Sequence, residues 1–137
     1  MEGPLPDAIR PVLQNGVPAV IVTCSVAGVP NATIISQAYY VDATHVALSF
    51  QFFNKTIRNV RENPRASLCL SDITGCANWV LDIEFVRSET DGPVFDEMDM
   101  QIEAIASATG MSGIFKLRAA DVYRVRSFER VPHDASS

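Results

Sequence analysis

The chain lacks a glycine-rich phosphate loop, since neither GxGxxG nor a P-loop occurs among its 137 residues. Proteins that bind a dinucleotide on a parallel sheet depend on such a loop, so we do not expect that class. The chain also lacks an excess of cations. Its formal net charge is −5, whereas nucleic-acid-binding proteins are normally basic. We therefore expect no nucleic-acid partner.

Long apolar runs are also missing. The run from Val17 to Ala27 is interrupted by Thr23, Cys24 and Ser25, and is too short to cross a bilayer. The first residues, 1–4, lack the cationic and apolar regions of a signal peptide. We therefore expect no membrane partner.

Cysteine and histidine are scarce. Cys24, Cys69 and Cys76 are odd in number and lack metal-ligand spacing, which favours a reduced, cytoplasmic location. Cys24 and Cys69 lie in apolar, strand-like runs, and we expect both thiols in the core. His45 and His133 have no serine or cysteine pattern nearby that would complete a nucleophilic triad. No metal site and no catalytic residue is predicted.

Apolar periodicity divides the chain into strands and short helices. Strands are expected at 18–24, 32–41, 45–50, 65–71 and 78–87, with one or two more between 114 and 126, and helices at 5–13, 54–63 and 93–110. The first three strands have connections too short for parallel crossovers, so we expect an antiparallel meander. The pattern predicts one domain over residues 1–137, mainly β in the α+β class, with six antiparallel strands forming a small barrel and helices inserted between them. Residues 1–5 and 131–137 are expected to fray.

The predicted helix that starts near residue 54 has an unusual first turn. Asn54 is a suitable N-cap, and Asn63-Pro64 ends the helix, because a residue before proline disfavours the helical conformation. Lys55 lies at the positive end of the helix dipole, where an unpaired cation costs about 0.3–1 kcal/mol. Free amides, the Thr56 hydroxyl and this ammonium would suit a phosphate. A solvated surface lysine is an equal alternative on these residues alone.

Polar and aromatic residues beside this helix extend the candidate site. Ser49 ends the preceding strand, where its hydroxyl either contacts the phosphate or faces solvent. Phe50, Phe52 and Phe53 either line a planar ring or belong to the core. Trp79 follows Asn78, and its indole suits the core or a dimer interface.

The expected strand at 32–41 and its preceding turn are rich in polar side chains for an apolar neighbourhood. Asn31, Thr33, Ser36 and Gln37 either bind a heterocycle with carbonyls and ring nitrogens or form a wetted edge. The sequence does not separate these two interpretations.

The order Phe52-Phe53-Asn54-Lys55-Thr56, then Asn59, then Asn63-Pro64 resembles the pyridoxamine 5'-phosphate oxidase-like FMN-binding split-barrel family. The resemblance extends from about Pro6 to Val131. It implies a six-stranded antiparallel split β-barrel with FMN as cofactor. It also implies a homodimer with flavin sites at the subunit interface.

The same resemblance implies roles for particular residues. Lys55 and Ser49 stand where relatives hold the FMN phosphate, and Asn54 supplies a neutral bond where relatives often have arginine. Asn78 stands where relatives have a flavin-contacting glutamine, with Trp79 beside it. The candidate cofactor-binding residues are therefore Thr33, Ser36, Ser49, Phe50, Asn54, Lys55, Thr56, Asn78 and Trp79.

Two features of the pyridoxal-forming oxidases are missing. The segment 31–36 lacks their arginine and lysine, and the chain ends without their C-terminal arginine and histidine. The resemblance thus implies an FMN-dependent oxidoreductase that transfers hydride between a reduced donor and another small-molecule substrate. The alternatives are a non-enzymatic flavin- or haem-binding sensor or storage module, and a deazaflavin-dependent reductase on the same scaffold.

Overall fold

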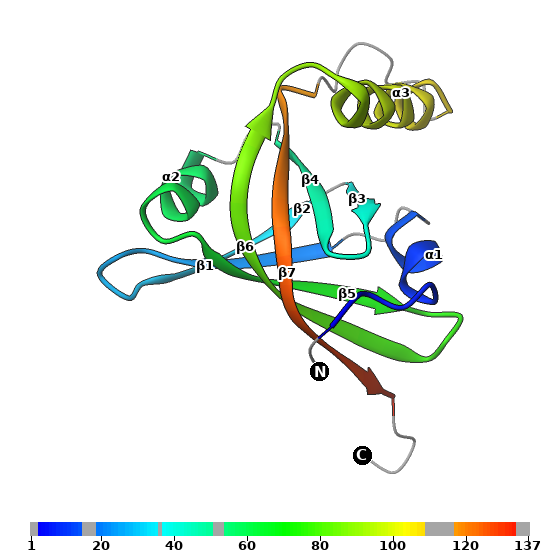
Figure 1. Cartoon of the computed structure of the whole chain (residues 1–137), viewed down its shortest axis with the longest axis horizontal. Coiled ribbons are helices and arrows are strands. Elements are labelled where there is room, and N and C mark those ends of the chain that lie inside the picture. Colours follow the sequence, from blue (N-terminus) through cyan, green and yellow to red (C-terminus); the bar gives the residue numbers. More distant parts are fainter. Residues whose placement is uncertain (1–2, 15–18, 36, 51–53, 109–116, 134–137) are drawn as a thin grey trace.

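The described residues form a single twisted sheet with three helices around it (Figure 1). This computed structural model describes residues 3–14, 19–35, 37–50, 54–108 and 117–133. The elements are α1 (Ile9–Gln14), β1 (Ala19–Cys24), β2 (Pro30–Ile35), β3 (Ala38–Asp42), β4 (His45–Phe50), α2 (Asn54–Glu62), β5 (Arg65–Asp72), β6 (Ala77–Glu89), α3 (Pro93–Ala108) and β7 (Ala119–Pro132). The 7 strands have the order β2-β1-β5-β6-β7-β4-β3. All their pairings are antiparallel, and the sheet curls into an open barrel.

The described residues contain seven strands instead of the expected six, because the expected strand at 32–41 is two strands. β2 pairs with β1 and β3 pairs with β4, so the two lie on opposite edges of the sheet. The predicted antiparallel pairing of neighbouring segments is confirmed, but they do not form one three-stranded meander, and the barrel is not closed. Gln37 explains the break. Its side-chain Nε2 donates to the Met98 carbonyl at 3.3 Å and to Gln101 Oε1 at 2.9 Å, both on α3.

The interior of the barrel is apolar. On β6, Trp79, Leu81 and Ile83 are buried and Phe85 is half-buried, which confirms the predicted alternation. α1 covers one end of this core through Ile9, Val12 and Leu13. A second cluster lies between α3 and the outward side of β4 and β7, and contains Ala47, Met98, Ile102, Leu117, Ala120 and Val122.

Several chain segments differ from their expected limits. α2 ends at Glu62, before Asn63-Pro64, as predicted. α1 is shorter than expected, yet Leu5 is buried and its N–H donates to the Ala43 carbonyl at 2.7 Å. β7 continues through Val131 and Pro132, two residues expected to fray. Gly110, expected to end α3, lies outside the described residues. Among the described helices, none combines the length and apolar character needed to span a membrane.

The cysteines are less buried than predicted. Cys24 and Cys69 are half-buried and Cys76 is exposed, and all three thiols are free. β1 and β5 alternate between the two sides of the sheet, with Thr23 and Leu68 pointing inward. Cys24 and Cys69 therefore lie on the outward side, and their prediction as core thiols was wrong.

Candidate functional site

Buried polar contacts fix the position of α2 against the end of β1. Ile57 and Val60 face inward, as their spacing predicts. Beside them, Asn59 Nδ2 donates to Thr23 Oγ1 at 3.0 Å, and both side chains are buried. This orientation leaves Lys55 exposed at the first turn, where backbone N–H groups have no partner within the helix.

The Thr56 hydroxyl is held by β2. Asn31 Nδ2 donates to Thr56 Oγ1 at 3.1 Å and to Thr33 Oγ1 at 3.2 Å, and the two hydroxyl oxygens are 3.2 Å apart. The structure thus brings the predicted site residues Thr33 and Thr56 together. Because the Thr56 hydroxyl already has protein partners, its backbone N–H is the group that it can offer to a ligand.

Ser49 lies at the end of β4, shortly before the first turn of α2. It is buried, and its Oγ is 3.5 Å from the Gln37 carbonyl, a weak contact that leaves the hydroxyl able to bind elsewhere. The first turn of α2 contains no acidic residue, so Lys55 has no carboxylate beside it there. A cation and free amides make a donor set that fits a phosphate, and the Ser49 hydroxyl is close to them in the chain.

The remaining predicted residues near α2 are only partly described. Phe50 lies in β4 and Asn54 opens α2, as predicted, but the structure does not describe either side chain. Ser36 lies outside the described residues. Their proposed contacts stay predictions.

Two further cations on α2 were missed by the sequence reasoning. Lys55, Arg58 and Arg61 recur every three residues and are exposed, and residues at this spacing are neighbours on a helix surface. A hollow of about 450 Å³ is lined by Ile57, Arg58, Arg61 and Glu62. The spacing of three residues between these cations is visible in the sequence and could have indicated that they share one face of the helix.

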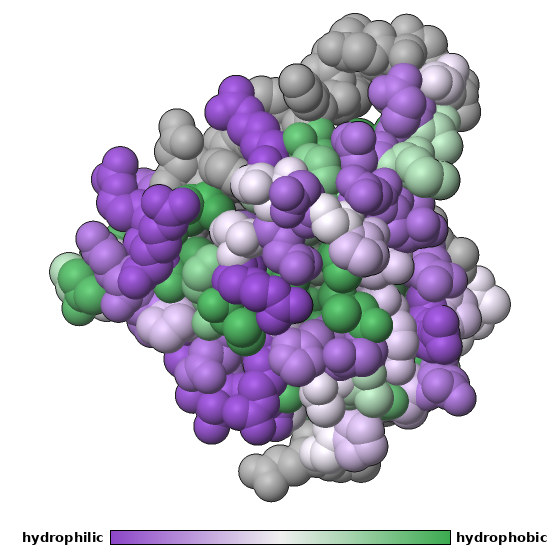
Figure 2. All heavy atoms as spheres, turned by 45° about the horizontal axis from the view of Figure 1, so that its top comes forward, coloured by the Kyte–Doolittle hydropathy of each residue, from purple (hydrophilic) through white to green (hydrophobic). Residues whose placement is uncertain are grey.

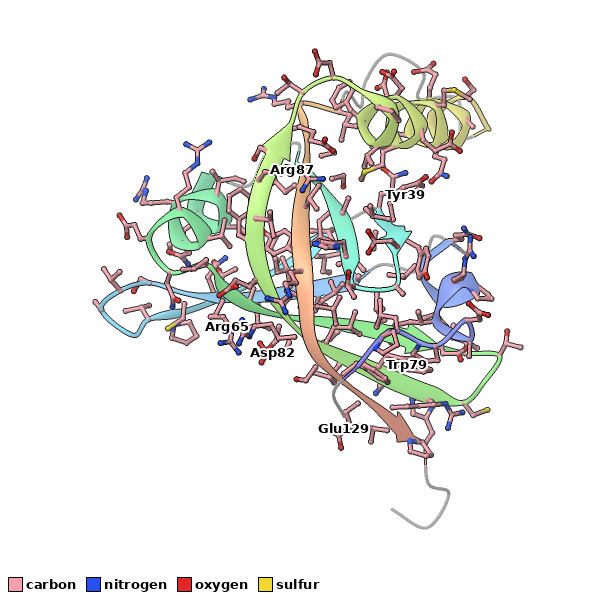
Figure 3. All side chains as sticks on the ribbon, in the orientation of Figure 1. Tyr39, Arg65, Trp79, Asp82, Arg87 and Glu129 are labelled. Carbon is pink, nitrogen blue, oxygen red and sulfur yellow. The ribbon has the colours of Figure 1, made fainter. Side chains whose placement is uncertain are left out.

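Trp79 and its neighbour Asn78 lie far from this helix within one chain, and Figure 3 shows the position of Trp79. Asn78 pairs with Ser71, five residues along β5 from Ala66, which lies opposite Thr23 beside α2. Five residues of strand span roughly 17 Å. Trp79 is only 3% exposed and packs against Phe128 in the core. The structure therefore does not bring these two predicted residues to Lys55.

β7 contributes a buried carboxyl that is not among the predicted site residues. Asp121 is only 4% exposed, and it accepts a hydrogen bond from Ser88 Oγ at 2.6 Å. Burial raises the pKa of Asp121, although the Ser88 bond and the Arg61 charge oppose that rise. Burial, together with the Asp121 charge, also raises the pKa of Tyr123.

We expect Asp121→Asn to raise the melting temperature at neutral pH. A raised pKa means that the folded state binds this proton more tightly than the unfolded state. The stability that Asp121 contributes is therefore complete below its ordinary pKa of 3.8 and is lost as the pH rises through its folded pKa. Asparagine keeps an acceptor for Ser88 without a charge. Thermal melts across the acidic range should show that the difference in melting temperature between the variant and the wild type shrinks as pH falls. A difference that does not change with pH would contradict this explanation.

Solved structures with the same fold carry different names. An FMN-binding protein from Syntrophomonas wolfei subsp. wolfei is 15% identical, with 89% of this chain and 82% of that chain covered and a TM-score of 0.74. An F420 reductase is 11% identical, with 91% and 98% covered and a TM-score of 0.65. HutZ, the heme storage protein from Vibrio cholerae, is 16% identical, with 93% and 94% covered and a TM-score of 0.59. At these identities the likeness shows the fold alone.

The sequence itself gives the family. No curated protein sequence matches the chain. The sequence model of the family described as pyridoxamine 5'-phosphate oxidase matches residues 5–126, which is most of the 137 residues. The match includes Ser49, the whole of α2 and the strand that follows it. The chain therefore belongs to the pyridoxamine 5'-phosphate oxidase-like FMN-binding split-barrel family, as the sequence around Lys55 implied.

Proposed function

We propose that this protein binds FMN and acts as an oxidoreductase, transferring hydride between a reduced donor and a small organic substrate. The observation that carries the proposal is the exposed Lys55 in a first turn without acidic residues, close in the chain to buried Ser49. Membership of the family and the shared fold with an FMN-binding protein support the choice of cofactor.

In this proposal the chain binds and orients the cofactor. Lys55 supplies a charge-assisted hydrogen bond to the phosphate, the amide of Thr56 a neutral one, and Ser49 a hydroxyl. Asn31 and Thr33 hold Thr56 so that this turn keeps its shape when the ligand leaves. When bound, flavin itself supplies the hydride chemistry.

We also propose that the protein is a cytoplasmic homodimer with its flavin sites at the subunit interface. Asn78 is exposed and lies far from Lys55 of the same chain, so a second subunit would have to bring it near the flavin. Trp79 is buried beside Phe128 and would not reach the flavin itself. The outward side of β1, β5 and β6 supports a partner, since it carries half-buried, mostly apolar side chains: Val20, Val22, Cys24, Cys69 and Val80. The free cysteines are consistent with a reduced compartment.

A comparison of FMN with riboflavin tests the phosphate end of the proposed site. Riboflavin carries the same ring but no phosphate, so FMN should bind at least about tenfold more tightly, a difference of about 1.4 kcal/mol. Flavin fluorescence during titration of the cofactor-free protein measures both values of Kd. Equal affinities would rule out a phosphate site at Lys55.

Reduction of the bound flavin then tests the proposed reaction. Anaerobic addition of NADH or NADPH to the FMN complex should bleach the oxidised flavin absorbance. Tight FMN binding without reduction by either donor, or by a reduced deazaflavin, would favour a sensor or storage module instead.

A further inference from the structure

A second hollow lies on the outward side of β7, away from the proposed flavin site. Its volume is about 430 Å³, and its lining residues are Gly3, Pro4, Thr44, Arg124, Val125 and Arg126. Arg124 lies opposite His45 on β4, four residues from Ser49. Four strand residues span roughly 13 Å, so this hollow and the first turn of α2 are separate places.

Arg124 is the unpaired cation of this hollow. It is exposed, and it makes no hydrogen bond or ion pair with the described residues. Its neighbour on β6, Glu84, instead pairs with Arg126 at 3.3 Å. Hydrophilic side chains cover much of the surface in Figure 2, with apolar side chains in patches between them. The guanidinium of Arg124 is thus free to bind an anion from solution.

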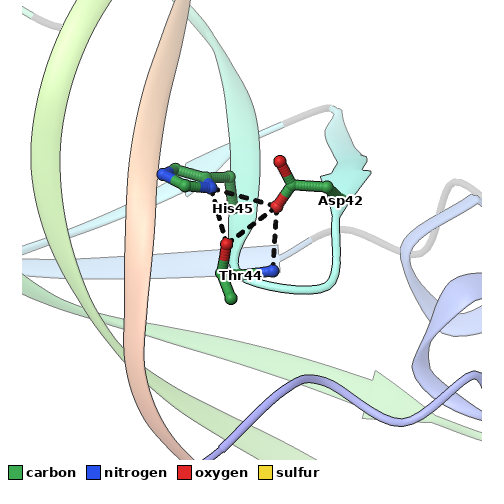
Figure 4. A network of polar contacts seen from close by, with 3 residues as sticks. All are labelled: Asp42, Thr44 and His45. Atoms are coloured by element: carbon green, nitrogen blue, oxygen red, sulfur yellow. Dashed lines mark hydrogen bonds and ion pairs between the residues drawn. The ribbon is translucent and has the colours of Figure 1, made fainter.

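The carboxylate of Asp42, beside the lining residue Thr44, also has hydrogen-bond partners within the protein (Figure 4). Asp42 Oδ1 accepts from the Thr44 N–H at 2.8 Å, from Thr44 Oγ1 at 3.0 Å and from His45 Nδ1 at 3.0 Å. Partial burial acts to raise the pKa of Asp42, but these bonds outweigh burial and lower it. Thr44 Oγ1 also lies 2.9 Å from His45 Nδ1, so the three side chains form one polar network. Nε2 points away from Asp42, toward β7.

We propose that this hollow binds a small oxyanion, the phosphate or carboxylate group of a small molecule, with Arg124 as its principal contact. The planar guanidinium offers paired N–H donors that match two oxygens of either group. Arg126 uses Nη1 for Glu84 and keeps further N–H donors. Thr44 and Val125 also line the hollow. The Val125 N–H donates to the Thr44 carbonyl at 2.8 Å, and this hydrogen bond joins the two sides of the hollow.

Amide NMR spectra during titration test this proposal without requiring activity. Inorganic phosphate and acetate are each added at constant ionic strength, with sodium chloride as the compensating salt. We expect the amide signals of Thr44 and Val125 to shift and saturate with at least one of the two anions. The anion that saturates them identifies the preferred group.

Two variants make the test specific. Arg124→Gln should weaken binding of the saturating anion at least fivefold. The rest of the spectrum should stay in place, which shows that the variant folds. Lys55→Gln should leave the Thr44 and Val125 shifts unchanged, because it alters only the proposed flavin site. Absence of saturation with both anions, or equal affinity in Arg124→Gln, would overturn the proposal.

Discussion

Lys55→Ala should weaken FMN binding by roughly 10- to 150-fold, while riboflavin binding changes little. A hydrogen bond to a charged group contributes about 1.5–3 kcal/mol, and this variant removes the only cation in the first turn of α2. Riboflavin has no phosphate, so it cannot lose that contact. The difference between the two ligands therefore separates loss of the phosphate contact from general damage to the site.

Arg10→Ala is the matched control for this variant. It also removes one positive charge, but on α1, which lies on the opposite side of the molecule from α2 (Figure 1) and where the Arg10 guanidinium lies over the Tyr40 ring. We expect its FMN affinity to stay within about twofold of the wild type, since exposed charges at long range are screened by salt. If both variants lose FMN equally, the effect comes from net charge and Lys55 is not the phosphate ligand.

Leu81→Ala should lower the free energy of unfolding by about 2–5 kcal/mol. Leu81 is fully buried in β6, opposite Leu68 of β5 and Phe128 of β7. The substitution removes apolar contacts and leaves a cavity in the middle of the sheet, where the paired strands cannot easily move to fill it. For a domain of this size, that is a large share of the total stability.

Urea unfolding followed by Trp79 fluorescence measures this loss, because the indole is buried beside Phe128. Val86→Ala on the same strand is the control. Val86 is 46% exposed, so we expect a loss below about 1 kcal/mol. Similar losses in both variants would contradict the assignment of Leu81 to the interior of the barrel.

Much of the sheet could be predicted because alternation of apolar and polar residues directly reports which side of a strand is buried. β6 shows this best, from Trp79 to Phe85. The break between β2 and β3 could not be predicted in this way. It depends on Gln37 binding the backbone and side chain of α3, about sixty residues later in the chain, and local propensity contains no information about that contact.

The candidate site was predictable where one residue conflicted with its local surroundings. Lys55 is such a residue, because a cation opposes the helix dipole at that position. The contact of Thr56 with Asn31 and Thr33 was not predictable, since it joins residues more than twenty positions apart. The burial of Asp121 was not predictable for another reason. The sequence of a strand does not show that an isolated aspartate is buried until the neighbouring strands are placed.

The most direct test of the central proposal is the absorption spectrum of the freshly purified protein, with mass spectrometry of any chromophore released on denaturation. We expect an oxidised flavin spectrum and release of FMN, or, if purification removes the cofactor, recovery of that spectrum when FMN is added back. A haem spectrum, or release of a deazaflavin in place of FMN, would contradict the proposal. So would a colourless protein that fails to take up FMN.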